Sequence, residues 1–199
     1  MRVEVRSDAV IIEGYVNAVG RDSRVMRDRK TGKRFVEQIR PGVFKRALER
    51  NEVLILLNHD ENRVLGSTES NLTLYEDAIG LKARAEITDA EVIEKAKSKK
   101  LRGWSFGFME VDASEEDMTN GLKRRFVEEM ELKEVSIIDE RKMPCYEGTS
   151  LETRAEGKEI IKSEVVEVRA TYVDCTPQSK EPVDYTKYKN KIKKLEEKE

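Results

Sequence analysis

Five consecutive apolar residues, Val53 to Leu57, are followed at once by Asn58, His59 and Asp60. A continuous apolar run of this length, ended by polar residues, predicts a strand that is buried on both faces. A strand of this kind lies inside a sheet, so we expect the chain to fold around a large sheet that contains this run. His59, at the exit of the strand, is the only histidine in the sequence.

Further strands are predicted on both sides of this run, from alternating or β-branched apolar residues. The segment from Ala9 to Val19 is cut by Gly14, which predicts a bend or bulge. Phe35 to Ile39 alternates like a half-buried strand, and the Thr31-Gly32 pair ahead of it predicts a hairpin turn. The segments VLGSTE, NLTLYED and GLKARAEI each predict one more strand.

Two short helices are predicted between the strands. In PGVFKRALER, Pro41 stands at the expected helix start, and the apolar residues that follow share one helical face: Val43, Phe44, Ala47 and Leu48. Thr88 and Glu91 fit a capping box, so the second helix is expected from Asp89 to Lys99.

The second helix leads into the segment LRGWSFGFMEV, in which Ser105 is expected to open a strand. The Asn120-Gly121 pair predicts a tight turn, and LKRRFVEEMELKEVSIID then predicts a long strand that ends near Ile138. These two strands are expected to form a hairpin.

The apolar content falls beyond Gly148, so we divide the chain of 199 residues into a main domain, 1–148, and a charged, flexible C-terminal tail, 149–199. A stripe of apolar side chains in the last fifteen residues predicts a short terminal docking helix, with a fraying solvated helix as the alternative: Tyr185, Tyr188, Ile192 and Leu195.

Charge and cysteine usage exclude several classes of function. The 38 Lys and Arg residues nearly balance the 40 Asp and Glu residues, so nucleic acid is not an expected partner. The N-terminus lacks the apolar stretch of a signal peptide and no run could span a membrane, so a soluble intracellular protein is expected. Cys145 and Cys175 form no CxxC pair, and a single histidine excludes a metal site with two imidazoles, so metal catalysis would have to rest on carboxylates alone.

Ser105 and His59 are the residues best suited to chemistry. A serine needs a base to become a nucleophile, and an imidazole titrates near neutral pH. A carboxylate commonly orients such an imidazole, and Glu134, in the apolar segment LKEVSIID, needs a buried partner if it faces the interior. Each residue also has an ordinary structural interpretation: Ser105 as a small polar residue at a strand start, His59 as a hydrogen-bonded residue, and Glu134 as the outward member of an alternating strand.

Five blocks in order favour the catalytic interpretation: EGYVNAV, FVEQIRPGVFKRAL, VLILLNHDENRVLGST, GWSFGF and LKEVSIID. Over residues 9–145 the chain resembles the prohead, or head-maturation, serine proteases of tailed phages, which are related in fold to the herpesvirus maturation proteases. The resemblance implies that His59 is the general base and Ser105 the nucleophile. Glu134 matches the place of the acidic third member.

Nearby carboxylates leave the third member open at this stage: Asp60, Asp139 and Glu140. The donors of the oxyanion hole also stay open, between backbone N–H groups of residues 105–107 and a group supplied by Arg141. The resemblance implies an α+β fold, with a predominantly antiparallel or mixed β-barrel-like core and a few surrounding helices, like the herpesvirus proteases. The helix-then-strand order around Ser105 is the reverse of the α/β-hydrolase nucleophile elbow.

The resemblance further implies a serine endopeptidase without a cofactor. Its expected substrates are the scaffolding protein or the scaffolding segment of the major capsid protein, and the protease itself. It would act in the host bacterial cytoplasm, inside the assembling procapsid, with a homo-oligomer left open. The alternative is a catalytically silent scaffolding or structural protein of the procapsid with the same fold.

Overall fold

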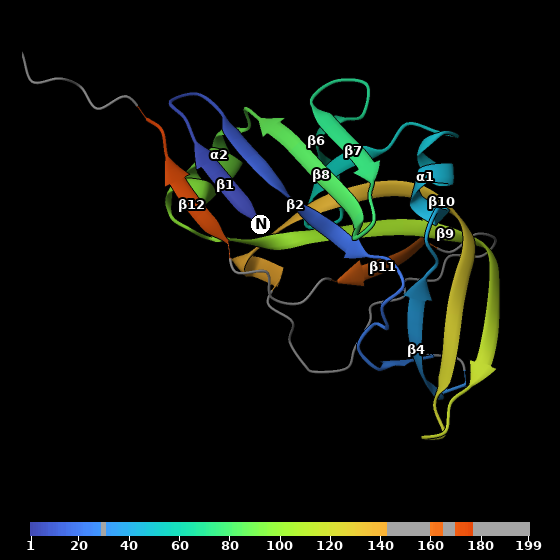
Figure 1. Cartoon of the computed structure of the whole chain (residues 1–199). Coiled ribbons are helices and arrows are strands. Elements are labelled where there is room, and N and C mark those ends of the chain that lie inside the picture. The colour runs from blue at the N-terminus through green and yellow to red at the C-terminus, as the bar shows by residue number, and fades with distance from the viewer. Residues whose placement is uncertain (29–30, 143–159, 165–169, 177–199) are drawn as a thin grey trace, which may run out of the picture.

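The computed structural model describes residues 1–28, 31–142, 160–164 and 170–176 of the chain (Figure 1). They form two β-sheets, two α-helices and one turn of 3-10 helix, η1 (Glu140–Lys142). The fold is therefore rich in strands with few helices, as the sequence predicted, and both sheets are mixed.

The first sheet has the strand order β12-β1-β2-β8-β7. Its outer pair, β1 and β12, is parallel, and every other pair in this sheet is antiparallel. The strands are β1 (Arg2–Val5), β2 (Val10–Ala18), β7 (Leu72–Glu76), β8 (Gly80–Ile87) and β12 (Thr171–Asp174).

The second sheet is built on two long strands, β9 (Leu101–Asp117) and β10 (Lys123–Asp139), which form an antiparallel hairpin. One half of β10 pairs in parallel with β4 (Arg34–Ile39), and the other half pairs in parallel with β5 (Leu54–Leu57). Three shorter strands complete it: β3 (Met26–Arg27) on β4, β6 (Asp60–Ser67) on β5 and β11 (Ile160–Glu164) on β9. Figure 1 shows β9 and β10 running side by side and continuing into an arm next to β4.

Both predicted helices are present, with different starts. Helix α1 (Val43–Leu48) begins after Gly42, whose φ of 86° suits glycine, so Pro41 lies before the N-cap rather than in the first turn. Helix α2 (Ala90–Lys97) is capped by Asp89, which accepts a hydrogen bond from the N–H of Val92 at 3.0 Å. The predicted capping box at Thr88 is therefore wrong by one residue, because the helix starts one residue later than expected.

The core lies between the two sheets and is mostly aliphatic, and its largest side chains include three aromatic residues of β9. Trp104, Phe106 and Phe108 are fully buried, and Phe106 contacts Phe44 of α1 edge-on at 5.3 Å between ring centroids. At Gly14 of β2, a Cβ atom would lie 3.3 Å from the indole Nε1 of Trp104, so glycine permits this close approach. The register shift in β2 falls after Tyr15, next to the bend predicted at Gly14.

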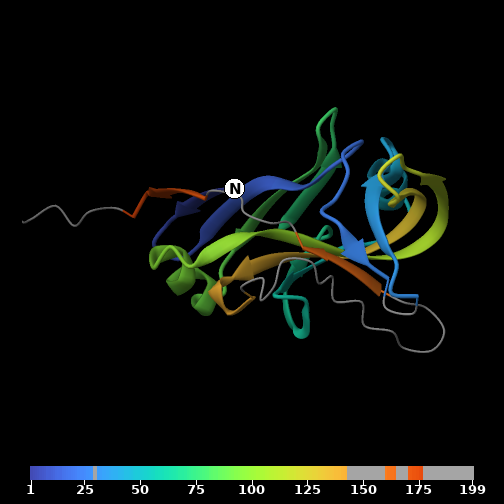
Figure 2. The same ribbon diagram turned by 90° about the horizontal axis from the view of Figure 1, so that it is seen from below.

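The barrel-like closure expected from the sequence is not seen in the described part of the chain. Within residues 1–28, 31–142, 160–164 and 170–176, the two sheets keep separate hydrogen-bonded ladders, and no ladder joins their edge strands into a ring. Figure 2 shows the two sheets from below.

Two strands lie beyond residue 148, where a tail was predicted. Strand β11 pairs with β9 and β12 pairs with β1, so these segments add to both sheets. The division at residue 148 stays a prediction, and the predicted terminal helix around Tyr185 to Leu195 lies outside the described residues.

Candidate active site

The two faces of β9 have different chemistry because side chains alternate along a strand. Trp104 and Phe106 point into the core, so Ser105 points to the opposite face of the second sheet. Ser136 of β10 lies directly across from Ser105. We call the side of the sheet that carries Ser105, Ser136 and Glu134 the site face.

A β-bulge in β10 places Glu134 on the site face. Leu132 pairs with Phe108, whereas Glu134 pairs with Gly107, so Lys133 is the extra residue. In a regular strand without this bulge, Glu134 would lie two residues after Leu132 and would point toward the core with it. Bulges commonly re-aim a side chain next to a functional site, and this one turns a carboxylate toward the histidine.

His59 lies at the tip of the hairpin between β5 and β6. Leu57 pairs with Asp60, so Asn58 and His59 form a two-residue turn, and both have a φ of 57°. Positive φ at both central residues is the geometry of a type I′ turn, and Asn and His are among the residues that tolerate it best. The turn brings the imidazole back over the site face.

Three hydrogen bonds fix this turn to β10. The N–H of Asn58 donates to the carbonyl of Ile137 at 2.9 Å, and the Oδ1 of Asn58 accepts from the N–H of Asp139 at 3.1 Å. The N–H of His59 donates to the Oγ of Ser136 at 3.0 Å. The position of His59 is therefore fixed by hydrogen bonds that join both turn residues to β10.

The imidazole of His59 connects Glu134 and Ser105. Its Nδ1 lies 2.6 Å from Oε1 of Glu134, and its Nε2 lies 2.8 Å from Oγ of Ser105. An ionised carboxylate can only accept hydrogen bonds, so Nδ1 donates to Glu134, and in the neutral imidazole Nε2 then accepts from the serine hydroxyl. This is the tautomer in which the lone pair of Nε2 faces the hydroxyl of Ser105 and can take its proton.

The three side chains are buried. Ser105 is 0% exposed, and the side chains of His59 and Glu134 are 1% and 7% exposed. A buried carboxylate is stable only when its oxygens are hydrogen-bonded, and here His59 bonds one oxygen and Ser136 the other. The sequence prediction that Glu134 needs a buried partner therefore agrees with its surroundings.

Ser136 was missed by the sequence reasoning. Its Oγ donates to Oε2 of Glu134 at 2.7 Å and accepts from the N–H of His59, so it holds both neighbours at once. The spacing of the core residues contains a signal for it: Leu132 and Val135 are three apart, whereas alternation requires an even step. That odd step indicates a bulge and places Glu134 and Ser136 on one face.

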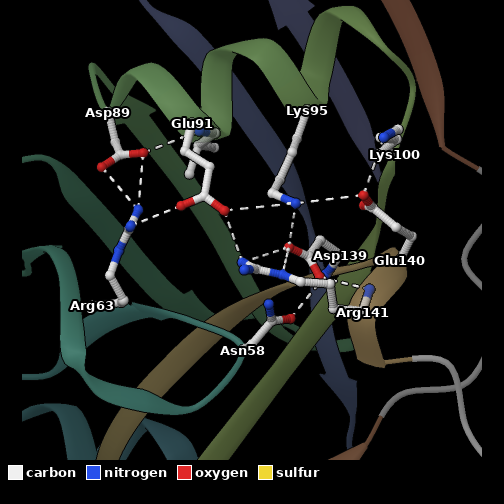
Figure 3. A network of polar contacts seen from close by, with 10 residues as sticks. Asn58, Arg63, Asp89, Glu91, Lys95, Lys100, Asp139, Glu140 and Arg141 are labelled. Atoms are coloured by element: carbon white, nitrogen blue, oxygen red, sulfur yellow. Dashed lines mark hydrogen bonds and ion pairs between the residues drawn. The ribbon is translucent and has the colours of Figure 1, made fainter.

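A network of ion pairs anchors the end of β10 beside the histidine turn (Figure 3). The buried carboxylate of Asp139 accepts from Nζ of Lys95 at 2.9 Å, and from the backbone N–H and Nε of Arg141 at 2.9 and 3.1 Å. Burial raises the pKa of Asp139, but the hydrogen bonds from Lys95, Arg141 and Asn58 outweigh it and lower the pKa to about 2. Asp139 is thus ionised at neutral pH and keeps the turn, β10 and α2 together.

The other carboxylates considered from the sequence are engaged elsewhere. Asp60 is exposed and accepts from the N–H of Asn62 at 2.9 Å. Glu140 pairs with Lys95 and Lys100 at 3.5 and 3.4 Å. The structure therefore brings together Ser105, His59 and Glu134 and leaves Asp60, Asp139 and Glu140 outside this set.

Arg141, one of the two candidates for an oxyanion donor, directs its guanidinium to Asp139 and Glu91. The assignment of the oxyanion-hole donors to Arg141 or to backbone N–H groups of residues 105–107 stays a prediction.

Comparison with protein families identifies the family of the chain. A family model described as caudovirus prohead serine protease matches residues 1–164. The chain belongs to the caudovirus prohead serine protease family. No curated protein and no solved structure matches the chain.

Membership in the prohead protease family implies serine peptidase activity with a role in phage head maturation, and hence association with the procapsid. None of the described helices is long and apolar enough to cross a membrane. Among the described residues, no group of three or more His, Cys, Asp or Glu side chains is arranged to hold a metal ion.

The surroundings of Ser105 in this prohead protease differ from those of an α/β-hydrolase. The letters of Gly103 to Gly107 do match the G-x-S-x-G pattern, but Ser105 lies within the continuous strand β9, paired with β10. A nucleophile elbow instead places its serine at a sharp turn between a strand and a helix. The pattern is therefore coincidental here.

Proposed function

We propose that this chain is a serine endopeptidase in which Ser105 is the nucleophile, His59 the general base and Glu134 the residue that orients His59. The observation that carries the proposal is the position of the single imidazole, within hydrogen-bonding distance of both a serine hydroxyl and a carboxylate. The assignment of His59 and Ser105 also follows the family motifs NHD and GWSFGF.

The geometry suits acyl transfer. His59 Nε2 takes the proton of Ser105 as Oγ attacks the carbonyl carbon of a peptide bond, and Glu134 stabilises the imidazolium that forms. The imidazolium then gives this proton to the leaving amine, and an acyl-enzyme ester remains on Ser105. Water attacks the ester with His59 again as the base, which releases the product acid and restores the hydroxyl.

The proposed substrates are the scaffolding protein or the scaffolding segment of the major capsid protein, inside the assembling procapsid in the host cytoplasm. Cleavage of the protease itself and assembly into a homo-oligomer belong to the same proposal, as does a distant kinship in fold with the herpesvirus proteases. The reaction as written needs no cofactor, because side chains perform every proton transfer.

Co-expression with the capsid protein of the same virus tests the proposal. The unaltered chain should shorten the capsid band on a denaturing gel, and Ser105→Ala and His59→Ala should each abolish the shortening. Ser114→Ala is a matched control, because Ser114 is an exposed serine on the same strand. A shortened band that persists in Ser105→Ala would contradict the assignment.

The second candidate function is a scaffolding protein that keeps the fold without turnover. It predicts normal procapsid assembly with full-length capsid protein in the presence of the unaltered chain. The complete hydrogen-bonded trio favours the protease, because a protein without catalysis has no physical need to bury these three groups together.

A further inference from the structure

Strand β9, which carries Ser105, is paired on both of its edges. Strand β10 occupies one edge of β9, and β11 pairs antiparallel along the other edge. In this register Glu164 lies opposite Ser105 and Ile160 lies opposite Met109. The backbone of β11 therefore follows the part of β9 that contains the nucleophile (Figures 1 and 2).

The edge of β9 is the place where an extended peptide could reach Ser105. Peptides commonly bind by adding a strand to a sheet edge, where backbone hydrogen bonds supply affinity. Adjacent strands lie about 4.8 Å apart, so a peptide strand here would place its backbone beside the serine. Attack needs a carbonyl within about 3.5 Å of Oγ, which a small local distortion of such a strand would provide.

The site is closed in the structure. Ser105 is 0% exposed, and so a substrate carbonyl cannot contact its Oγ without a rearrangement. Strand β10 cannot be the part that moves, because it carries Glu134 and Ser136 and is held by β4 and β5. Strand β11 has five residues, and among the described strands it pairs with β9 alone.

We propose that β11 occupies the substrate-binding edge of β9, and that a scaffold or capsid segment is cleaved after it displaces β11 and pairs antiparallel with residues 105–109. This inference rests on the proposed protease function and adds the mode of substrate binding to it. The segment is a tethered competitor of the substrate, and a tether of this kind gives an effective concentration of about millimolar. Dilute peptides would lose this competition, whereas substrate concentrated inside a procapsid would win it.

Two adjacent prolines in β11 test the proposal in the full-length chain. Lys162→Pro with Ser163→Pro removes a ladder N–H whichever of the two residues faces β9. The control is Val173→Pro with Asp174→Pro in β12, a short strand that also lies beyond residue 148 but pairs with β1. The readout is the rate at which a small fluorophosphonate labels Ser105, located by mass spectrometry with Ser105→Ala as the blank.

The β11 variant should be labelled at least tenfold faster than the unaltered chain, and the β12 control within about twofold of it. Equal or slower labelling of a β11 variant that keeps its circular dichroism spectrum would overturn the proposal and show that β11 is a fixed part of the site. Absence of label on Ser105 in every variant would instead overturn the proposed protease function.

A second measurement needs no substitution. A synthetic peptide of residues 158–166, added to the unaltered protein at several times the effective concentration of about millimolar that the tether gives, should take the place of β11 and accelerate amide hydrogen exchange of residues 160–164 in the chain. An isotopic label on the peptide separates its own signals. Unchanged exchange at the highest peptide concentration would refute displacement even if the proline variant does not fold.

Discussion

Glu134→Gln tests the electrostatic part of the proposed site. The amide keeps the size of the side chain and can still accept from Nδ1 of His59 through its oxygen, with its NH₂ group toward Ser136. It removes the negative charge that faces Nδ1 at 2.6 Å. Two unit charges with centres about 4 Å apart, at an effective dielectric constant of about 20, interact by about 4 kcal/mol. That stabilisation exists only when His59 is protonated, so its loss acts on the transition state.

The expected result is a fall of about a thousandfold in the rate of the chemical step, since each 1.36 kcal/mol corresponds to about tenfold. The rate of fluorophosphonate labelling of Ser105 measures this step on the isolated chain, and capsid cleavage in co-expression measures it in assembly. Glu131→Gln is the control, because Glu131 lies on the same strand and is partly exposed.

Labelling of Glu134→Gln within about threefold of the unaltered chain would refute the electrostatic argument. The role of Glu134 would then be limited to holding the ring, which the amide can also do. A normal unfolding transition is needed to exclude a general loss of structure.

Three further predictions concern the groups that hold the trio. Ser136→Ala removes the hydrogen-bond partner of the His59 N–H and of one Glu134 oxygen in a buried site. The free energy of unfolding should therefore fall by about 2 to 4 kcal/mol in denaturant titrations, and labelling of Ser105 should slow about tenfold. An unchanged unfolding midpoint would contradict this prediction. Asn58→Ala should destabilise the protein by about 1 kcal/mol more than Asn58→Gly. Both variants lose the hydrogen bond to the N–H of Asp139, but only alanine is strained at a φ of 57°. Equal unfolding midpoints for the two variants would argue against strain in the turn. The pKa of Asp139 is lowered to about 2 from 3.8, so its ionisation stabilises the fold above about pH 4, and this stability is lost as the pH falls toward 2. The difference in unfolding free energy between the unaltered chain and Asp139→Asn should therefore shrink by about 2 kcal/mol over that range, and a constant difference would count against the ionised form.

Local patterns in the sequence predict the individual strands well, because each has its own apolar alternation or turn signal. The run Val53 to Leu57, the Asn120-Gly121 turn and the long strand after it all have counterparts in the structure. The pairing of β10 with both β4 and β5 was not predicted, since parallel partners far apart in the sequence leave no local signal. The helix cap was misplaced because Thr88 and Asp89 are both good capping residues and only the backbone decides between them.

The candidate trio was inferred from chemistry and family motifs, and the structure supplies the distances. Ser136 was missed because a serine in an alternating strand resembles any other polar residue until its partners are known. Strands β11 and β12 were missed because their charged, weakly apolar segments gain their hydrogen bonds from strands that are already in place. Such segments become strands because they pair with the edge of an existing sheet, and their own β-propensity is too weak to predict them.

The bulge at Lys133 has a consequence for comparing relatives. The step of three between Leu132 and Val135 carries geometric information that survives when the residues themselves change. A homologue whose carboxylate sits in this strand but whose aliphatic positions keep an even step would aim that acid into the hydrophobic interior. Counting residues between aliphatic positions therefore offers a test of which distant sequences retain a working acid, independent of whether that acid is Asp or Glu.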